Sequence, residues 1–242
     1  MGAAKAAVAG VMRRAVVDDE VLGLPAVVPL FPLPGVVLFP GTIIPLHIFE
    51  PRYRAMVADA LAGERYVAIA LLKRGWEPLY HTPRAPIHPT VGVGRILEHE
   101  QTDDGNYNIL LRGVGRARIV EELREHLYRV ARIEAIETRC TADETAAETL
   151  REELFDAIRG NPGLDPGLRR QWLRLRDTDL DLGTLSDLLA AGVPAEAELR
   201  QCLLEEADAA ARTRMLVEQI RTVAAIARNV PRVGPPRRQS LN

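Results

Sequence analysis

The amino-acid sequence changes character once, near residue 138, and this change limits the folds open to the chain. From Leu24 to Glu137, short apolar runs such as Val27–Phe31 are separated by Pro and Gly. Runs of strand length broken by turn residues predict about six to eight short strands in a small, wholly or partly closed β-barrel. After Thr138 the apolar residues recur with a helical period. The sequence therefore predicts an α+β protein whose β-domain comes first.

Proline and the dipeptide Asp-Gly indicate where strands of the β-domain end. Prolines stand at positions 29, 32, 34, 40 and 45. Because proline cannot donate to a ladder, we expect these positions at edges, corners or bulges. Asp103–Asn106 contains Asp-Gly between two strand-like runs and predicts a hairpin turn. Pro51 is placed to begin a helix that ends near Gly63.

The second half of the chain predicts a bundle of four or five helices. The expected helices begin near Leu150, Leu168, Thr184, Pro194 and Asp208. Thr184 with Asp187 resembles a capping box. We therefore expect a disordered leader at 1–23, the β-domain at 24–137, the helical bundle at 138–230 and a disordered tail at 231–242. Met12 is an alternative start of the chain.

Charge and composition exclude several classes of protein. Residues 24–137 contain 13 Lys and Arg against 13 Asp and Glu, and aromatic residues make up 5% of the whole chain. A DNA-binding or RNA-binding surface normally needs a basic stripe, and RNA also needs stacking platforms, so no DNA partner is expected and RNA is only an alternative. Cys140 and Cys202 are the only cysteines, which favours a reducing, cytoplasmic location. No apolar run is long enough for a membrane span.

Several motifs resemble the N-terminal substrate-binding domain of Lon proteases. The segment Leu30–Gly41 reads LFPLPGVVLFPG, and Pro45–Tyr53 reads PLHIFEPRY. Both segments are similar to the opening of that domain. The second segment most closely resembles the one found in free-standing, Lon-like bacterial proteins. Leu111–Arg116 and Gln201–Glu205 resemble later elements, so the resemblance covers residues 25 to 228. It implies a PUA-like pseudo-barrel followed by a helical bundle.

The parts of Lon that perform catalysis have no counterpart in the sequence. The chain contains no G-x-x-x-x-G-K-[ST] motif, which would hold nucleotide phosphates. Its serines are Ser186, expected within a helix, and Ser240, expected in the tail; neither has a lysine in an expected neighbour. We therefore expect a free-standing, Lon-like protein that is not an enzyme and has no catalytic residues.

No metal or cofactor is expected either. His81, His88 and His99 lack the spacing and the companion ligands of a metal site. Gly92, Gly94, Gly113 and Gly115 do not precede a predicted helix, so they mark bends in strands rather than a phosphate site. Arg95, Arg112 and Arg116 are expected to point outward into solvent, and the alternative is that they line one side of the barrel.

The expected function is recognition of protein or peptide segments. The candidate peptide-binding residues are Val37, Phe39, Glu50, Arg52, Tyr53 and Arg54. The first two lie in the apolar segment Val36–Phe39, which has two interpretations. It forms an apolar groove beside an unpaired strand edge, a common arrangement for binding extended peptides, or its side chains fill the barrel. The other four lie at a strand-to-helix turn, where they have an alternative structural role: Glu50 near the helix start, Tyr53 in packing and an Arg in bracing the corner.

The expected partner is an unfolded protein or a peptide, which the chain would bind as an adaptor. A protease is a further candidate partner. RNA binding through the barrel is the alternative function, and a small molecule in a barrel pocket is a third. The sequence leaves the oligomeric state open.

Overall fold

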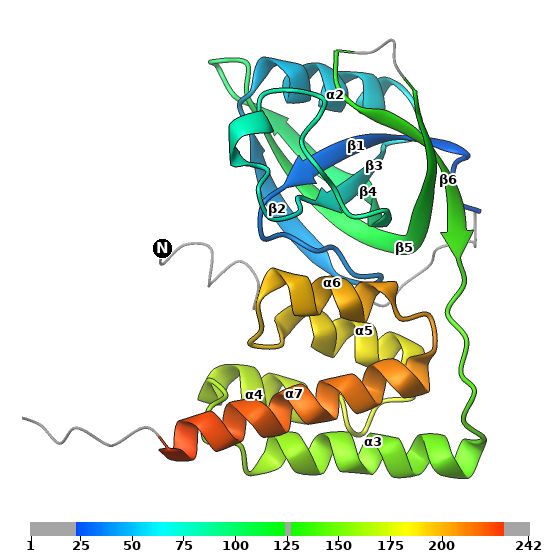
Figure 1. Cartoon of the computed structure of the whole chain (residues 1–242), viewed down its shortest axis with the longest axis vertical. Helices are drawn as coiled ribbons and strands as arrows, with labels where there is room; N and C mark the ends of the chain where they lie inside the picture. Colours follow the sequence, from blue (N-terminus) through cyan, green and yellow to red (C-terminus); the bar gives the residue numbers. More distant parts are fainter. Residues whose placement is uncertain (1–22, 124–126, 230–242) are drawn as a thin grey trace, which may run out of the picture.

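The computed structural model describes residues 23–123 and 127–229. Its first part is built from strands and two short helical segments (Figure 1). They are β1 (Val27–Leu33), β2 (Ile43–Ile48), α2 (Pro51–Ala62), β3 (Tyr66–Leu71), η2 (Glu77–Leu79), β4 (Thr90–Gln101), β5 (Tyr107–Leu123) and β6 (Val130–Ile136). The hairpin predicted at Asp103–Asn106 is present, with Gly105 in the left-handed region at φ 79°.

The strands form one sheet that closes on itself. The order is β2-β5-β4-β3-β1-β6, and an additional pairing between β5 and β6 completes the barrel. β5 makes this possible because it is 17 residues long. Its first half pairs with β2 and its second half pairs with β6. A register shift between Ile119 and Glu121 accompanies the second pairing, as expected where a long strand bends.

Prolines 29 and 32 lie within β1, where each has a ladder partner on one side only. The first half of β1 pairs with β6 through Pro29, and the second half pairs in parallel with β3 through Pro32. Pro45 lies in β2, which pairs with β5 alone. All three positions leave one side of the strand without a ladder, which is where a residue that lacks an N–H is tolerated.

Five further helices follow the barrel. They are α3 (Glu144–Arg159), α4 (Pro166–Leu173), α5 (Leu182–Gly192), α6 (Ala197–Glu205) and α7 (Ala209–Asn229). In Figure 1, α5 and α6 lie directly beneath the barrel, and α7 lies alongside α3 at the base. The α+β architecture, with strands first and helices second, is confirmed. The bounds 24–137 and 138–230 agree with strands that end at Ile136 and a first helix that begins at Glu144, but they stay a prediction.

Aspartates start three of these helices. Asp143, Asp165 and Asp181 each accept a hydrogen bond from a main-chain amide in the first turn of α3, α4 and α5, which satisfies donors that a helix leaves unpaired. The prediction that Thr184 begins a capping box with Asp187 is wrong. Asp181 is the capping residue, and Asp187 lies one turn inside α5 and is buried.

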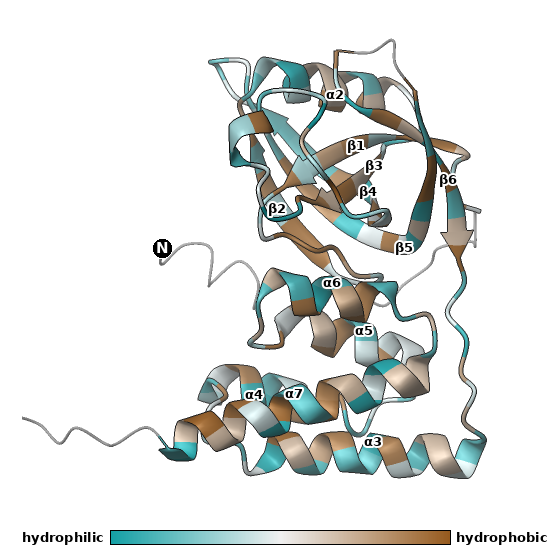
Figure 2. Cartoon of the chain, viewed as in Figure 1, coloured by the Kyte–Doolittle hydropathy of each residue, from teal (hydrophilic) through white to brown (hydrophobic). Residues whose placement is uncertain are grey.

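The barrel and the helices have separate apolar cores that meet at one segment. Residues 36–39 contact both cores, and Figure 2 shows apolar residues on the strands of the barrel and on the helices that lie beneath it. Leu38 packs into the barrel core with Ile96 and Leu111. Phe39 packs into the helical core with Trp172. The predicted leader, save Gly23, and the predicted tail lie outside the described residues.

Glycine allows this crossing segment to lie close to the sheet. A Cβ atom on Gly92 would overlap the carbonyl oxygen of Leu38, and one on Gly113 would overlap that of Phe39. Both glycines are buried in neighbouring strands, β4 and β5. The prediction that these glycines serve the backbone rather than a phosphate therefore has a steric explanation.

Candidate functional site

Four of the six predicted peptide-binding residues lie where β2 passes into α2. We call residues 47–54 the β2–α2 corner. Glu50 precedes α2 and accepts hydrogen bonds from Tyr80 Oη at 2.9 Å and from Arg52 Nε at 3.1 Å. Arg52 also donates to the carbonyl oxygen of Tyr80 at 3.1 Å. The Glu50 and Arg52 side chains therefore tie the corner to the segment that contains Tyr80.

Tyr53 is a packing residue of the corner. Its ring lies 4.5 Å from that of Phe31 and beneath the guanidinium of Arg52, 4.4 Å from the ring centroid. Burial raises the pKa of Tyr53 well above the usual tyrosine value, although the positive charge of Arg52 opposes the shift. The phenol of Tyr53 is therefore neutral, and the residue contributes to the corner through the packing of its ring.

The segment that Glu50 and Arg52 hold is rich in aromatic groups. We call residues 76–81 the aromatic loop. Trp76 and Tyr80 pack edge to face at 5.1 Å, and His81 packs against Tyr80 at 5.0 Å. Burial, followed by the hydrogen bond to Glu50, raises the pKa of Tyr80. Leu79 in the same loop is 37% exposed. The loop therefore presents apolar surface, and the contacts of Glu50 and Arg52 with Tyr80 hold the loop in place.

Phe49 is an exposed aromatic side chain next to Glu50. It is 62% exposed, in the β2–α2 corner, and its ring stacks on His47 at 6.1 Å. Arg54, on the first turn of α2, donates to the carbonyl oxygen of Asp104 in the β4–β5 turn at 3.2 Å. An exposed Phe flanked by positioned polar groups is typical of a contact residue rather than of a core residue.

Val37 and Phe39 lie apart from the other four predicted residues. Phe39 is fully buried in the helical core, and Val37 packs against the same core. The apolar segment that the sequence suggested as an uncovered surface is covered by the helices. The β2–α2 corner thus contains Glu50, Arg52 and Arg54 as partly exposed residues, Tyr53 as a buried one, and neither Val37 nor Phe39.

Sequence reasoning missed Phe49, Trp76, Leu79 and Tyr80. A usable signal was present for the loop, because the sequence has only two tryptophans and five tyrosines, and one of each falls within five residues between two strands. Aromatic residues in such a loop have no assured place in a core. Phe49 lies within the PLHIFEPRY segment, but its exposure depends on how β2 meets α2.

The expectation that Arg116 points into solvent is wrong. Arg116 is 1% exposed and forms an ion pair with the buried Asp187 of α5. Arg212 of α7 approaches the same carboxylate at 3.2 Å, and both arginines donate to the carbonyl oxygen of Glu206. Burial raises the pKa of Asp187, and the two guanidinium groups act against that shift. This cluster of Arg116, Asp187 and Arg212 joins the barrel to the helices.

His88 forms a second polar contact between the barrel and the helices. Its Nε2 lies 3.1 Å from Glu198 Oε2, and its Nδ1 lies 3.5 Å from Glu205 Oε1. Gln201, between these two residues on α6, donates to the carbonyl oxygen of Thr90 at 2.9 Å. His88 thus has a structural role at the interface between the barrel and α6.

The described residues offer little for catalysis or for metal binding. Ser186 is buried, donates to the carbonyl oxygen of Gly183 and accepts from Arg212 Nε at 3.0 Å, so its hydroxyl is occupied in the interface. Ser240 lies outside the described residues. In the part of the chain that the structure describes, no three His, Cys, Asp or Glu side chains gather so as to hold a metal ion. Nor does any described helix have the length and apolarity of a membrane span.

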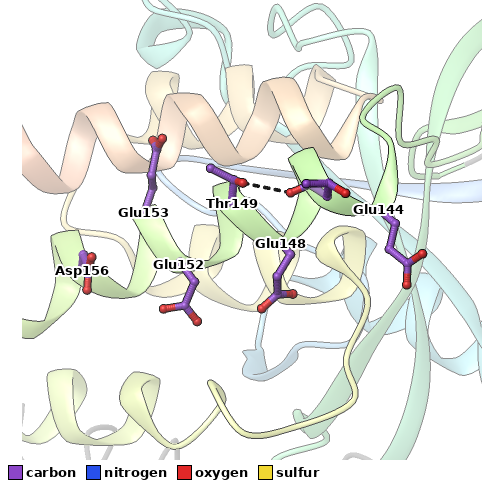
Figure 3. Close-up of a pocket in the computed structure, with 7 residues that line it drawn as sticks. Glu144, Glu148, Thr149, Glu152, Glu153 and Asp156 are labelled. Atoms are coloured by element: carbon purple, nitrogen blue, oxygen red, sulfur yellow. Dashed lines mark hydrogen bonds between the residues drawn. The ribbon is translucent and has the colours of Figure 1, made fainter.

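An open, acidic surface runs along α3 (Figure 3). It is lined by Glu144, Thr145, Glu148, Thr149, Glu152, Glu153 and Asp156. Thr149 Oγ1 donates to the carbonyl oxygen of Thr145 at 2.9 Å, and Glu152 forms an ion pair with Arg176 at 2.6 Å. All seven residues belong to one helix, and the cations that pair with them among the described residues are Arg176 and, from the same helix, Arg159, which lies 3.1 Å from Asp156. We assign no chemistry to this surface.

Two curated relatives match most of the chain. A Lon protease of Anaeromyxobacter dehalogenans (strain 2CP-C) is 32% identical over 196 residues, which is 81% of this chain and 23% of that protein. Lon protease 2 of Myxococcus xanthus is 30% identical over 196 residues, with the same two coverages. The chain thus spans less than two thirds of the length of these relatives.

Two solved structures share the fold. The N-terminal domain of a Mycobacterium avium complex Lon protease has a TM-score of 0.60 and 20% identity, over 80% of this chain and 97% of that one. A Lon N-terminal domain protein from Xanthomonas campestris has a TM-score of 0.54 and 23% identity, over 79% and 97%. A family described as the ATP-dependent protease La (LON) substrate-binding domain matches residues 27–222. The chain therefore belongs to the family of LON substrate-binding domains.

Proposed function

We propose that the chain binds segments of other proteins without catalysing a reaction, and that it does so through the β2–α2 corner and the aromatic loop. The family match supports a role in substrate recognition. The observation that carries the proposal is the exposure of Phe49 and Leu79 beside a network in which Glu50, Arg52 and Tyr80 satisfy one another. Apolar side chains on a rigid, internally satisfied frame can bind a partner without losing much conformational freedom.

The polar groups of the corner favour a protein partner over RNA. Arg52 is engaged by Glu50 and by the carbonyl oxygen of Tyr80, and Arg54 by the carbonyl oxygen of Asp104. Guanidinium groups held this way are less available to phosphates, which supply most of the affinity of RNA binders. In this proposal the chain binds an unfolded protein. Its role in the cell would then be to deliver that unfolded protein to a protease.

The test is a binding titration with a permanently unfolded protein. Fluorescein-labelled protein that has been reduced and carboxymethylated is titrated with the chain, and its native form serves as the comparison. We expect saturable binding of the unfolded form, measured by fluorescence anisotropy. Replacing both Phe49 and Leu79 with Ala is expected to weaken it about tenfold or more, because contact residues of this kind contribute at least about 1 kcal/mol each.

The matched control is Ile226→Ala. Ile226 is 60% exposed, almost as much as Phe49, but it lies near the end of α7, in the helical part of the molecule. Its replacement should leave binding unchanged. Equal weakening by both variants would show that binding is unspecific. Binding of single-stranded RNA in place of the unfolded protein, with strong dependence on salt, would replace the proposal with the RNA alternative.

A further inference from the structure

Strand β2 has a neighbour on one side only. The barrel closes through the pairings of β5 with β6 and of β1 with β6, and β2 pairs with β5 alone. Its second edge therefore belongs to no ladder of the described residues. Such an edge presents main-chain donors and acceptors that another extended chain can satisfy.

The register shows which groups form this edge. Gly113 N donates to Thr42 O, and the pairing then continues with Ile44 opposite Leu111 and Leu46 opposite Ile109. In an antiparallel pair, alternate residues direct both main-chain groups toward the partner. The main-chain groups of Ile43, Pro45 and His47 therefore face away from β5. Across residues 23–123 and 127–229, no hydrogen bond is found for them on that side.

The side chains of β2 anchor the strand on one face and leave the other face exposed beside the free edge. Ile44, Leu46 and Ile48 pack into the barrel core, which holds the strand in place. Pro45 and His47 are exposed on the opposite face, and Phe49 follows in the same alternation with its ring stacked on that of His47. A strand added at this edge would place alternate side chains beside that exposed row.

Pro45 restricts what the partner can be. It contributes a carbonyl oxygen but no N–H, so the edge offers the N–H groups of Ile43 and His47 and the carbonyl oxygens of all three residues. A second copy of β2 paired about its centre would set Pro45 opposite Pro45, and neither could donate. An ordinary segment supplies the N–H that the carbonyl oxygen of Pro45 needs.

We infer that an extended, uncharged segment of an unfolded polypeptide adds as a strand to the free edge of β2, with apolar side chains beside Pro45, His47 and Phe49. The inference rests on the proposed function and specifies its substrate: main-chain atoms in an extended conformation, with alternating apolar side chains. Recognition of the main chain would allow this edge to bind many sequences, because every segment without proline carries the same donors and acceptors.

The experiment uses a peptide whose main chain can be altered without changing its side chains. The probe is a fluorescein-labelled peptide of about eight residues, a common strand length, in which Val and Thr alternate. A second peptide carries N-methyl groups on consecutive central amides, which prevents pairing in either register. We expect the first peptide to bind and the second to bind at least about tenfold more weakly, since several hydrogen bonds are lost. Equal binding of the two peptides overturns the inference.

Amide hydrogen exchange locates the contact on the full chain. With the first peptide present, exchange at Ile43 and His47 should slow, whereas Ile44 and Leu46 are already paired with β5 and should change little. His47→Pro, which removes one outward N–H, should weaken binding about fivefold. His47→Ala keeps that N–H and should weaken binding less. A larger loss with His47→Ala, or protection confined to the aromatic loop, overturns the inference.

The failures of the two proposals are distinguishable. If the peptide and the unfolded protein bind, but Ile43 and His47 are not protected and N-methylation has no effect, the proposed function stands and the strand addition is wrong. If neither ligand binds, both are wrong. A dimer of the chain that His47→Pro dissociates, measured by sedimentation without peptide, would assign the edge to a second copy and would also overturn the inference.

Discussion

The replacement Asp187→Ala tests the cluster that joins the barrel to the helices. Asp187 is the only carboxylate of this cluster, and its partners Arg116 and Arg212 are 1% and 0% exposed. The replacement leaves two buried guanidinium groups with carbonyl and hydroxyl partners but without the carboxylate that both contact, while Glu206 and Asp208 act on Arg212 only at longer range. A buried charge without a counter-ion is far more costly than a broken surface ion pair.

The magnitude follows from the number of charges left uncompensated. Removing one partner of a buried ion pair costs about 3 to 5 kcal/mol, and here one carboxylate serves two cations. We expect a loss near the upper end, about 5 kcal/mol, in the free energy of unfolding. Because domains are stable by roughly 5 to 15 kcal/mol, this loss would remove between about a third and all of the stability of the chain.

The assay is urea denaturation followed by circular dichroism and by tryptophan fluorescence. Trp172 is fully buried in the helical core and reports on that part of the molecule. A loss of 5 kcal/mol should move the midpoint by about 2 M or more. Asp181→Ala is the control, because Asp181 lies on the same helix and caps it from an exposed position. Its replacement should cost about 1 kcal/mol.

Two results would refute this reasoning. The first is an Asp187→Ala variant that loses no more stability than Asp181→Ala. The second concerns the triple variant Arg116→Met, Asp187→Leu and Arg212→Met, which removes all three charges together. It should unfold at least as late as the unaltered chain, since buried ion pairs rarely exceed the stabilising effect of apolar residues of similar size. A triple variant as unstable as Asp187→Ala would show that lost packing, and not uncompensated charge, causes the effect.

Two further predictions concern backbone packing and pH. Gly92→Ala should lower the free energy of unfolding by roughly 3 kcal/mol, because its Cβ would overlap Leu38 O. Gly160→Ala, which meets nothing within 4 Å, should change it by less than about 0.5 kcal/mol in urea titrations, and similar losses in both variants would contradict the steric argument. Burial alone would raise the pKa of Asp208, but hydrogen bonds from Thr141 and from the first amides of α7 outweigh it and hold this pKa below its usual value. Because the folded-state pKa is depressed, Asp208 stabilises the protein above the unfolded-state value of about 3.9 and loses this effect as the pH falls through the folded-state value. Asp208→Ala should therefore cost about 1 kcal/mol at pH 7 and less at pH 3, and an equal cost at both pH values would refute the assignment.

The features that sequence reasoning predicted are those that local pattern determines. The stripe of Leu150, Leu154 and Ile158 lies on α3 because spacing by four residues places side chains on one face of any helix. The hairpin at Gly105 follows likewise from a turn residue between alternating strands. Neither depends on what the rest of the chain does.

The features that escaped prediction depend on contacts between distant residues. Arg116 and its partner Asp187 are 71 positions apart, and the local sequence around either residue does not predict that the two form a pair. An arginine in a strand looks solvent-exposed until the helix that covers it is known. The exposure of Phe49 and the burial of Phe39 have the same origin, since both depend on where β2 and the helices lie relative to the barrel.

The segment 36–39 affects how such a protein can be divided or recombined. Consecutive residues, Leu38 and Phe39, belong to different cores, and the second core lies more than a hundred positions further along the chain. Cutting the chain where the strands end would leave an empty space beside Trp172 in one fragment and an uncovered phenylalanine in the other. An exchange of helices between relatives would thus have to be matched at residue 39, although the two parts occupy separate stretches of sequence.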